Sequence, residues 1–187
     1  YTITPIIDNP SYFSILPTSV NVNFTLGSEN LVQDFCITPT GTHNDLEVTI
    51  LPINQARPGF DATYIVSYRN KGNSIQSGTI TFAYDDNVMD YIYSNFVASN
   101  LSSGLLTWNF TDLSGFESRS FLVTFNLNSP VETPPLNSGS ILNYSAEIIG
   151  LTDEYPTDNS SILNQTVVNS FDPNDKTCLE GATIAPS

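Results

Sequence analysis

The feature that most constrains this chain is a two-residue alternation of apolar and polar side chains that recurs along most of its length. In the clearest example, Leu46 and Val48 alternate with Glu47 and Thr49. Successive side chains of a β-strand point to opposite faces, so this alternation predicts strands with one buried face. The strands are predicted at 45–53, 62–69, 78–84, 88–94, 105–110, 118–127, 141–149 and 161–168.

The segments between these strands carry turn residues, and no helical periodicity exceeds about two turns. The strands recur at the spacing of about 8–12 residues that is typical of a sandwich. Residues 44–169 are therefore predicted to be all-β, an immunoglobulin-like antiparallel β-sandwich of seven or eight strands. Its predicted core consists of Leu46, Val48, Tyr64, Val66, Trp108, Phe121, Val123, Phe125, Tyr144 and Ala146.

Residues 1–43 have a different pattern, in which short extended stretches are interrupted by turns such as Asp8-Asn9-Pro10. They contain too few strands to close a sandwich, so we predict a partial β-domain that ends in a linker. Residues 170–187 are predicted to be a second linker and the start of a next domain. The chain opens on a strand-like alternation, and we expect it to be an internal part of a longer protein.

The charge and hydropathy patterns argue against two classes of partner. Five Lys and Arg against 19 Asp and Glu give a formal net charge of −14 at pH 7. Such a charge repels phosphate backbones and argues against nucleic-acid binding. No apolar run approaches the roughly 18 residues that a membrane-spanning helix needs, so no membrane span is predicted.

The reactive side chains argue against catalysis. A serine or cysteine nucleophile usually needs a histidine base, and the only histidine is His43, in the predicted linker. We expect His43 to be a solvated loop residue and predict no enzymatic activity. One histidine and two distant cysteines also lack the spacing of a zinc site. A covalent lysine–asparagine bond is disfavoured because Lys71 lies in a predicted turn and Lys176 in the second linker.

Acidic loops make calcium the one cofactor that the sequence predicts, because calcium prefers carboxylate and carbonyl oxygens held on loops. The candidate ligands lie in three loops: Asp85 and Asp86, then Asp153, Glu154 and Asp158, and finally Asp172, Asn174 and Asp175. None of the loops has the spacing of an EF-hand. The alternative is that these side chains are solvated turn residues that accept local backbone hydrogen bonds.

The two cysteines leave two interpretations open. A disulfide between Cys36 and Cys178 is compatible with secretion. The alternative is a pair of small buried residues with no bond between them. Two cysteines are too few to indicate a disulfide framework, so the sequence does not decide.

Seven segments carry motifs in a characteristic order and spacing: 45–49, 58–64, 66–72, 106–109, 113–118, 143–148 and 156–161. Together they resemble a known family, the bacterial conserved-repeat immunoglobulin-like domains. Where that family has Pro-Gly, this chain has Ser114-Gly115. The segment 170–176 is similar to a junction in large secreted surface proteins of the Bacteroidetes, which commonly leave the cell by the type 9 secretion system. Residues 1–43 are similar to the last strands of Cna-B/SdrD-type repeats.

This resemblance implies a non-catalytic structural repeat module: a stalk, spacer or filament element of an adhesin-like protein that is secreted or held at the cell surface. Its partners would be neighbouring domains or copies of the same protein. The resemblance implies no single ligand. The alternatives are a module that binds a glycan or a protein, and an accessory domain of a large secreted hydrolase.

Overall fold

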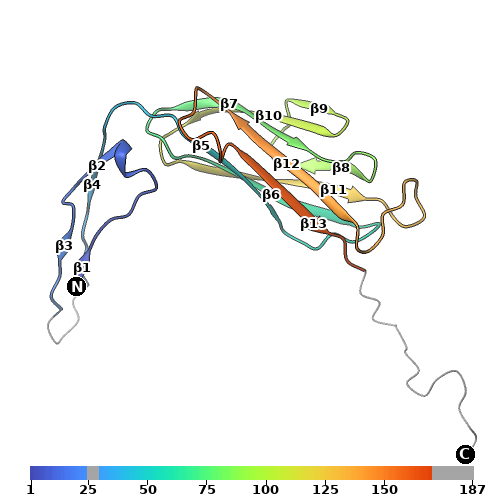
Figure 1. Cartoon of the computed structure of the whole chain (residues 1–187), viewed down its shortest axis with the longest axis horizontal. Helices are drawn as coiled ribbons and strands as arrows, with labels where there is room; N and C mark the ends of the chain where they lie inside the picture. The colour runs from blue at the N-terminus through green and yellow to red at the C-terminus, as the bar shows by residue number, and fades with distance from the viewer. Residues whose placement is uncertain (25–29, 170–187) are drawn as a thin grey trace, which may run out of the picture.

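The structure is a computed structural model, and it describes residues 1–24 and 30–169. Among these residues there is no α-helix, and no helix has the length and hydropathy needed to cross a membrane. Figure 1 shows the arrangement of the elements. In chain order they are β1 (Thr2–Ile3), the short 3-10 helix η1 (Pro10–Tyr12), β2 (Phe13–Leu16), β3 (Val20–Asn21), β4 (Cys36–Pro39), β5 (Leu46–Pro52), β6 (Asp61–Asn70), β7 (Gln76–Ala83), β8 (Met89–Ser94), β9 (Asn100–Ser102), β10 (Leu105–Leu113), β11 (Ser118–Leu127), β12 (Ile141–Ile149) and β13 (Ser160–Thr166).

Two antiparallel sheets form the body of the molecule, in the orders β13-β12-β7-β10-β9 and β5-β6-β11-β8. Buried side chains alternate with exposed or half-buried ones along β6, β11 and β12, as the inner faces of a sandwich require. The predicted all-β, immunoglobulin-like antiparallel sandwich is confirmed. It has one strand more than the seven or eight expected, because the three exposed residues of β9 are too short a segment to show an alternation.

All ten predicted core residues are buried, which confirms the predicted strand registers. The polar atoms carried into this core are paired. The Tyr64 and Tyr144 hydroxyls lie 2.5 Å apart, and the Tyr64 hydroxyl also donates to Gln165 Oε1 at 2.6 Å. Trp108 Nε1 donates to the carbonyl oxygen of Phe96 at 2.8 Å. Large aromatic side chains therefore fill the core without leaving these polar groups unsatisfied.

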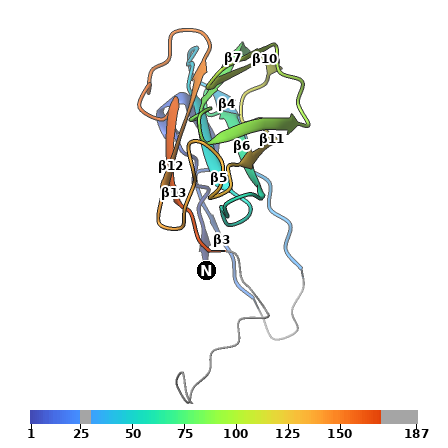
Figure 2. The ribbon, with the colours of Figure 1, turned by 90° about the vertical axis from the view of Figure 1, so that its right-hand side faces the viewer.

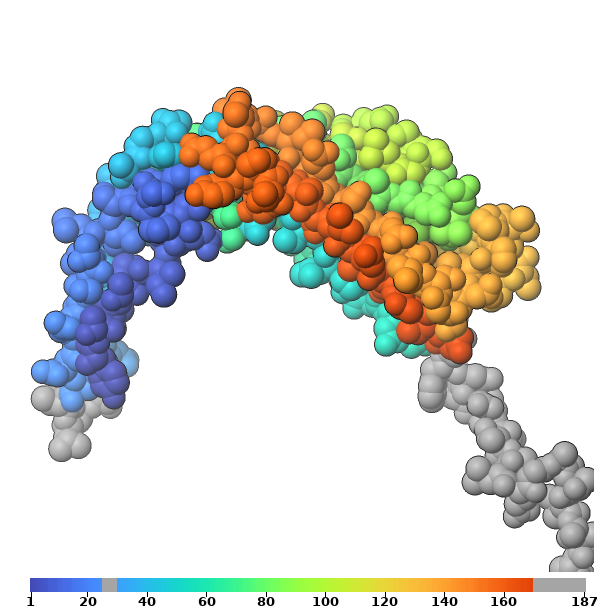
Figure 3. Space-filling model, in the orientation of Figure 1, coloured from blue at the N-terminus to red at the C-terminus, as the bar shows by residue number. Residues whose placement is uncertain are grey.

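The first strands lie outside both sheets. β1 pairs with β3, and β2 pairs with β4, so each forms a two-stranded ribbon of its own. We call this part of the chain the arm (residues 1–24 and 30–42). Figure 3 shows the arm projecting from one end of the sandwich at an angle to the sandwich's long axis.

The sandwich has two ends that matter for function. At the arm pole β5 begins, β6 ends and the loop 150–159 joins β12 to β13. At the exit pole, the opposite end, β13 ends at Thr166 (Figure 1). The chain between the start of β5 and the end of β13 therefore begins at one pole and finishes at the other.

The first and last strands of the sandwich run side by side in the same direction. Val48 N donates to the carbonyl oxygen of Asp158 at 3.1 Å, and Ile50 N donates to Ser161 Oγ at 3.2 Å. Seen end-on in Figure 2, the β12–β13 hairpin lies beside β5. This contact between the two sheets brings the start of β5 next to the loop that precedes β13.

Candidate functional site

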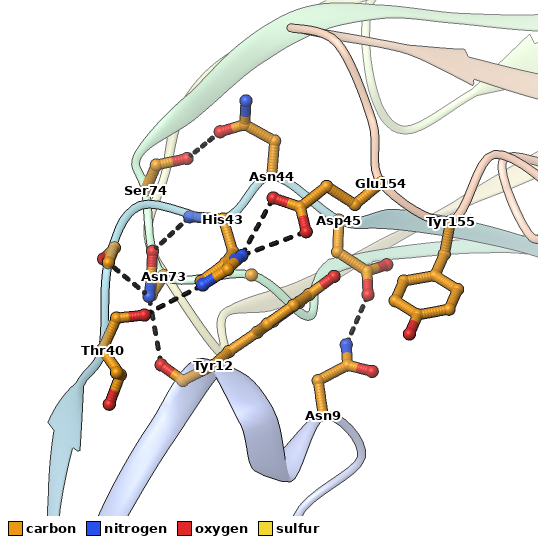
Figure 4. A network of polar contacts seen from close by, with 12 residues as sticks. Asn9, Tyr12, Thr40, His43, Asn44, Asp45, Asn73, Ser74, Glu154 and Tyr155 are labelled. Carbon is orange, nitrogen blue, oxygen red and sulfur yellow. Dashed lines mark hydrogen bonds and ion pairs between the residues drawn. The ribbon is translucent and has the colours of Figure 1, made fainter.

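Polar and charged side chains of four segments meet at the arm pole. The segments are the turn before η1, the chain that leads from the arm into β5, the turn after β6, and the loop 150–159. Figure 4 shows the part of this junction that surrounds Tyr12, His43 and Asp45. None of these segments is close to all of the others in sequence, so the junction exists only in the folded chain.

His43 lies at the centre of the arm side of the junction. Its ring stacks on Tyr12 with the ring centroids 4.0 Å apart and the planes 8° from parallel. Nδ1 lies 2.9 Å from Glu154 Oε1, and Nε2 lies 2.9 Å from the carbonyl oxygen of Thr40. Both ring nitrogens therefore lie within hydrogen-bond distance of an oxygen atom. The expectation of a solvated His43 is wrong: its side chain is 25% exposed, because the arm folds back over it.

The turn after β6 is bonded to the chain that enters β5. Asn73 Oδ1 accepts from His43 N at 2.8 Å, and Asn73 Nδ2 donates to the carbonyl oxygen of Tyr12 at 3.3 Å. Gly72 is required here by close approach. A Cβ on Gly72 would overlap the carbonyl oxygen of His43 and lie 2.9 Å from Asp45 N. The motif Asn70-Lys71-Gly72 thus builds the surface onto which the arm docks.

Beneath the arm lies a cluster of three charged side chains, which we call the buried ion cluster (Asp45, Lys71 and Asp158). Lys71 Nζ lies 2.5 Å from Asp158 Oδ2 and 3.8 Å from Asp45 Oδ1. The Asp45 side chain is 0% exposed, and those of Lys71 and Asp158 are 14% and 26% exposed. Asn9 of the arm closes the cluster by donating from Nδ2 to Asp45 Oδ2.

The cluster is electrostatically unbalanced, because two carboxylates share one ammonium group. Burial raises the pKa of Asp45 to about 6, and the nearby Asp158 adds to this rise, while Lys71 and the Asn9 hydrogen bond oppose it. Burial lowers the pKa of Lys71, but its hydrogen bond to Asp158 and the charge of Asp45 outweigh burial, so that the net pKa is raised. One buried oxygen on each carboxylate, Oδ1 of Asp45 and Oδ1 of Asp158, has no hydrogen-bond partner in the part of the chain that the structure describes.

The other predicted ligands of the loop 150–159 bind protein donors. Asp153 Oδ2 accepts from Leu46 N and Asp153 Oδ1 from Tyr155 N, both at 2.7 Å. Glu154 binds His43, and Asp158 binds Lys71. Within residues 1–24 and 30–169, no group of three or more His, Cys, Asp or Glu side chains is placed to hold a metal ion. The carboxylates of this loop thus contact protein donors in this structure, and calcium at this loop stays a prediction.

The acidic turn after β7 lies toward the exit pole and is bonded within itself. Asp85 Oδ1 accepts from Asn87 N at 3.1 Å. Asp86 accepts from the Tyr84 hydroxyl at 2.9 Å and from Ser103 Oγ at 2.6 Å, and these hydrogen bonds lower its pKa. The structure therefore places Asp85 and Asp86 far from the loop 150–159.

The remaining predicted site residues are only partly described. Asp172, Asn174 and Asp175 lie outside the described residues, and so does Cys178. Its predicted partner Cys36 is exposed at the start of β4. The calcium site at 172–175 and the disulfide therefore stay predictions.

Two members of the buried ion cluster, Asp45 and Lys71, were not among the predicted site residues. The sequence pattern places Asp45 at the start of a strand and Lys71 in a turn, where a covalent bond to asparagine is disfavoured. One local signal could have indicated that Asp45 is buried: this charged residue directly precedes Leu46 and Val48, the alternating apolar residues of the strand. Its partners are 26 and 113 residues away in the sequence, which no local pattern can show.

Comparison with known proteins finds similarity of fold. A cohesin module of a family 33 glycoside hydrolase from Clostridium perfringens is 11% identical, with a TM-score of 0.46 over 70% of this chain and 100% of that chain. CaCohA2 from Clostridium acetobutylicum is 13% identical, with a TM-score of 0.45 over 68% of this chain and 92% of that chain. The CARDB domain of a Pyrococcus furiosus protein is 18% identical, with a TM-score of 0.43 over 67% of this chain and 96% of that chain. No protein-family model and no curated protein matches this chain.

Proposed function

We propose that this chain is a non-catalytic structural module, a stalk or spacer element of a secreted or cell-surface bacterial protein of the adhesin type. Its partners are the neighbouring domains or copies that flank it along the same stalk. The observation that carries the proposal is that the first strand of the sandwich, β5, begins at the arm pole, whereas the last strand, β13, ends at the exit pole.

This position determines how tension along the chain acts on the fold. A pull on both ends draws β5 out at the arm pole and β13 out at the exit pole, each along its own axis. Their neighbours β6 and β12 hold them through antiparallel ladders, whose hydrogen bonds are perpendicular to the strands. Tension along the strand axis therefore strains all the bonds of a ladder together rather than one after another.

Both terminal ladders are long enough for this to matter. The β5–β6 ladder runs from Leu46↔Asn70 to Pro52↔Tyr64, and the β12–β13 ladder runs from Ile141↔Thr166 to Glu147↔Ser160. The contacts from β5 to Asp158 and Ser161 add a third attachment between the strands that bear the load. The geometry is thus suited to resist extension.

The chemistry of the described residues supports a non-catalytic role. The single histidine is held between Glu154, Thr40 and the Tyr12 ring, at a structural junction. The secreted or surface setting is supported by the sequence resemblance to bacterial surface-protein repeats.

Single-molecule force spectroscopy on the full chain tests the proposal. In one geometry the handles are attached to the two chain ends, so that β5 and β13 are pulled along their axes. In the control geometry the handles are at the N-terminus and at Thr157→Cys, in a background where Cys36 and Cys178 are serine. Thr157 is exposed in the loop at the arm pole, so this pull peels the strands from one end.

We expect a clearly higher unfolding force for the end-to-end geometry than for the peeling geometry. Equal forces, or a lower force end to end, would contradict a load-bearing role.

A further inference from the structure

We propose that Lys71 and Asp158 condense into an intramolecular isopeptide bond, with the Asp45 carboxyl group as the proton relay. The bond would join the end of β6 to the loop that precedes β13, and so join the two sheets covalently at the arm pole. This inference does not depend on the structural role proposed above, because it concerns a chemical reaction within the folded chain.

The first argument is proximity. The reacting nitrogen, Lys71 Nζ, is 2.5 Å from Asp158 Oδ2 and is therefore already within reach of the carboxyl carbon. The Lys71 backbone is held in place as well, since its N–H donates to the carbonyl oxygen of Asp45 at 2.7 Å. Groups fixed in this way react as if at very high concentration, because the entropy of bringing them together is already lost on folding.

The second argument is burial. The arm covers the buried ion cluster, and the Asn9 side chain bonds to Asp45 from above. Burying two carboxylates and one ammonium group in a region of low dielectric constant is costly. An amide bond removes the charges of Lys71 and Asp158 together. Asp45 Oδ1 lies 3.8 Å from Nζ and has no hydrogen-bond partner among the described residues, so it can accept the N–H of the amide that forms.

The reaction balances without an added oxidant or cofactor. A proton passes from the Lys71 ammonium group to the Asp158 carboxylate, which leaves a neutral amine beside a carboxylic acid. The amine nitrogen attacks the carboxyl carbon of Asp158 and forms the new C–N bond. Asp45 takes a proton from the nitrogen and returns one to the departing oxygen, so the C–O bond breaks and one water molecule leaves. The raised pKa of Asp45, about 6, allows it to act in both directions near neutral pH.

Lys71 can reach Asp158 because it lies in the turn directly after β6. A turn residue would be expected to point into solvent, yet the side-by-side course of β5 and β13 carries Asp158 over the end of β6. The side chain of Lys71 is then enclosed by the arm, by the start of β5 and by the loop 150–159.

Intact-mass spectrometry of the folded full chain tests the proposal directly. We expect a mass one water molecule below the sequence mass. Trypsin should fail to cleave after Lys71, and a branched peptide should link the segment that contains Lys71 to the segment that contains Asp158. Lys71→Arg keeps the positive charge but removes the reactive amine, and Asp158→Ala removes the carboxyl group, so both should show the full sequence mass.

Two variants identify the chemistry more closely. Asp158→Asn should still react but release ammonia in place of water, which changes the mass deficit. Asp45→Asn should fold, as judged by circular dichroism, but react much more slowly. Lys176→Arg is the matched control, because Lys71 and Lys176 are the only lysines of the chain, and the deficit should persist in it.

The bond should also raise thermal stability, because it closes residues 72–157 into a loop in the unfolded chain. We expect the melting temperature of Lys71→Arg to be roughly 10 °C lower than that of the unaltered chain. A folded unaltered chain with its full sequence mass and with cleavage after Lys71 would overturn the proposal and leave an ordinary ion pair.

Discussion

The arm and the sandwich are both built from extended segments, yet they differ in what these segments bury. In the sandwich, β6 and β12 bury every second side chain. In the arm, β4 exposes all four of its residues, and Ile6 is 93% exposed. The two regions differ because each sheet of the sandwich packs against a second sheet, whereas the arm consists of two-stranded ribbons with no opposing sheet.

This difference shows what an alternating pattern needs in order to produce a core. A two-stranded ribbon is at best marginally stable in water, because it has no opposing layer to cover its apolar face. The arm is instead anchored through its contacts at the arm pole. Tyr12 and Phe13 are buried there, and Asp8 pairs with Arg69 at 2.9 Å. The sandwich is thus held by its core, and the arm by its junction.

The largest expected effect is the loss of stability when a core side chain of the sandwich is truncated, compared with a truncation in the arm. Phe125→Ala should lower the free energy of unfolding by about 4 kcal/mol, because Phe125 is fully buried and packs against Tyr64, Phe82 and Tyr144. Ile6→Ala in the arm should change it by less than about 0.5 kcal/mol. Urea denaturation of both variants measures the contrast, and equal losses would refute the distinction between the regions.

The next prediction concerns the junction alone. Tyr12→Ala removes a buried ring that stacks on His43, so it should free the arm while the sandwich stays folded. Amide hydrogen exchange should then speed up in the arm, for example at Thr40 N, which donates to the carbonyl oxygen of Tyr12. Exchange in β6 and β11 should be unchanged. Tyr1→Ala, at an exposed ring, is the matched control, and unchanged arm exchange in Tyr12→Ala would contradict the proposed anchoring.

A third prediction uses pH. The pKa of Asp45 is about 6 in the folded chain against 3.8 for the free side chain, so the folded state binds the proton more tightly. The resulting stabilisation is fully present below about pH 4 and is lost as the pH rises through 6. As the pH rises over this interval, the titration of Asp45 should lower the free energy of unfolding by on the order of 2 kcal/mol.

The measurement is urea denaturation at a series of pH values, with Asp45→Asn beside the unaltered chain. The readout is the slope with pH rather than the absolute stability. The free energy of unfolding of the unaltered chain, minus that of Asp45→Asn, should fall as the pH rises from about 4 to above 6. A difference that rises with pH would contradict the prediction.

The smallest expected effect concerns calcium at residues 172–175. If Asp172, Asn174 and Asp175 bind calcium together with a following domain, millimolar calcium should raise the melting temperature and EDTA should lower it. Asp172→Ala should weaken this response. Asp153→Asn should not, because the Asp153 carboxylate is bonded to backbone amides at the arm pole. Identical melting curves in calcium and EDTA would support the alternative of solvated turns.

Much of the sandwich could be predicted from the sequence, because strand faces follow from local alternation. Trp108, Phe121 and Tyr144 lie in the core where the pattern places them. β9 was missed because three residues show no period. His43 was assigned to solvent because nothing nearby in the sequence shows that Tyr12 and Glu154 would enclose it.

By itself, then, the sequence determined which side chains of each strand point inward, since that depends only on the two-residue repeat of the backbone. Only the tertiary structure decided which loops meet at each pole. Asp45 lies beside Asp158 because β5 and β13 run in the same direction at the edge of the two sheets, and Lys71 joins them because β6 ends where β5 begins. The physical reason is the sequence distance over which the interactions act. Alternation depends only on neighbouring residues, whereas the order of strands in a sheet depends on the burial of the whole core.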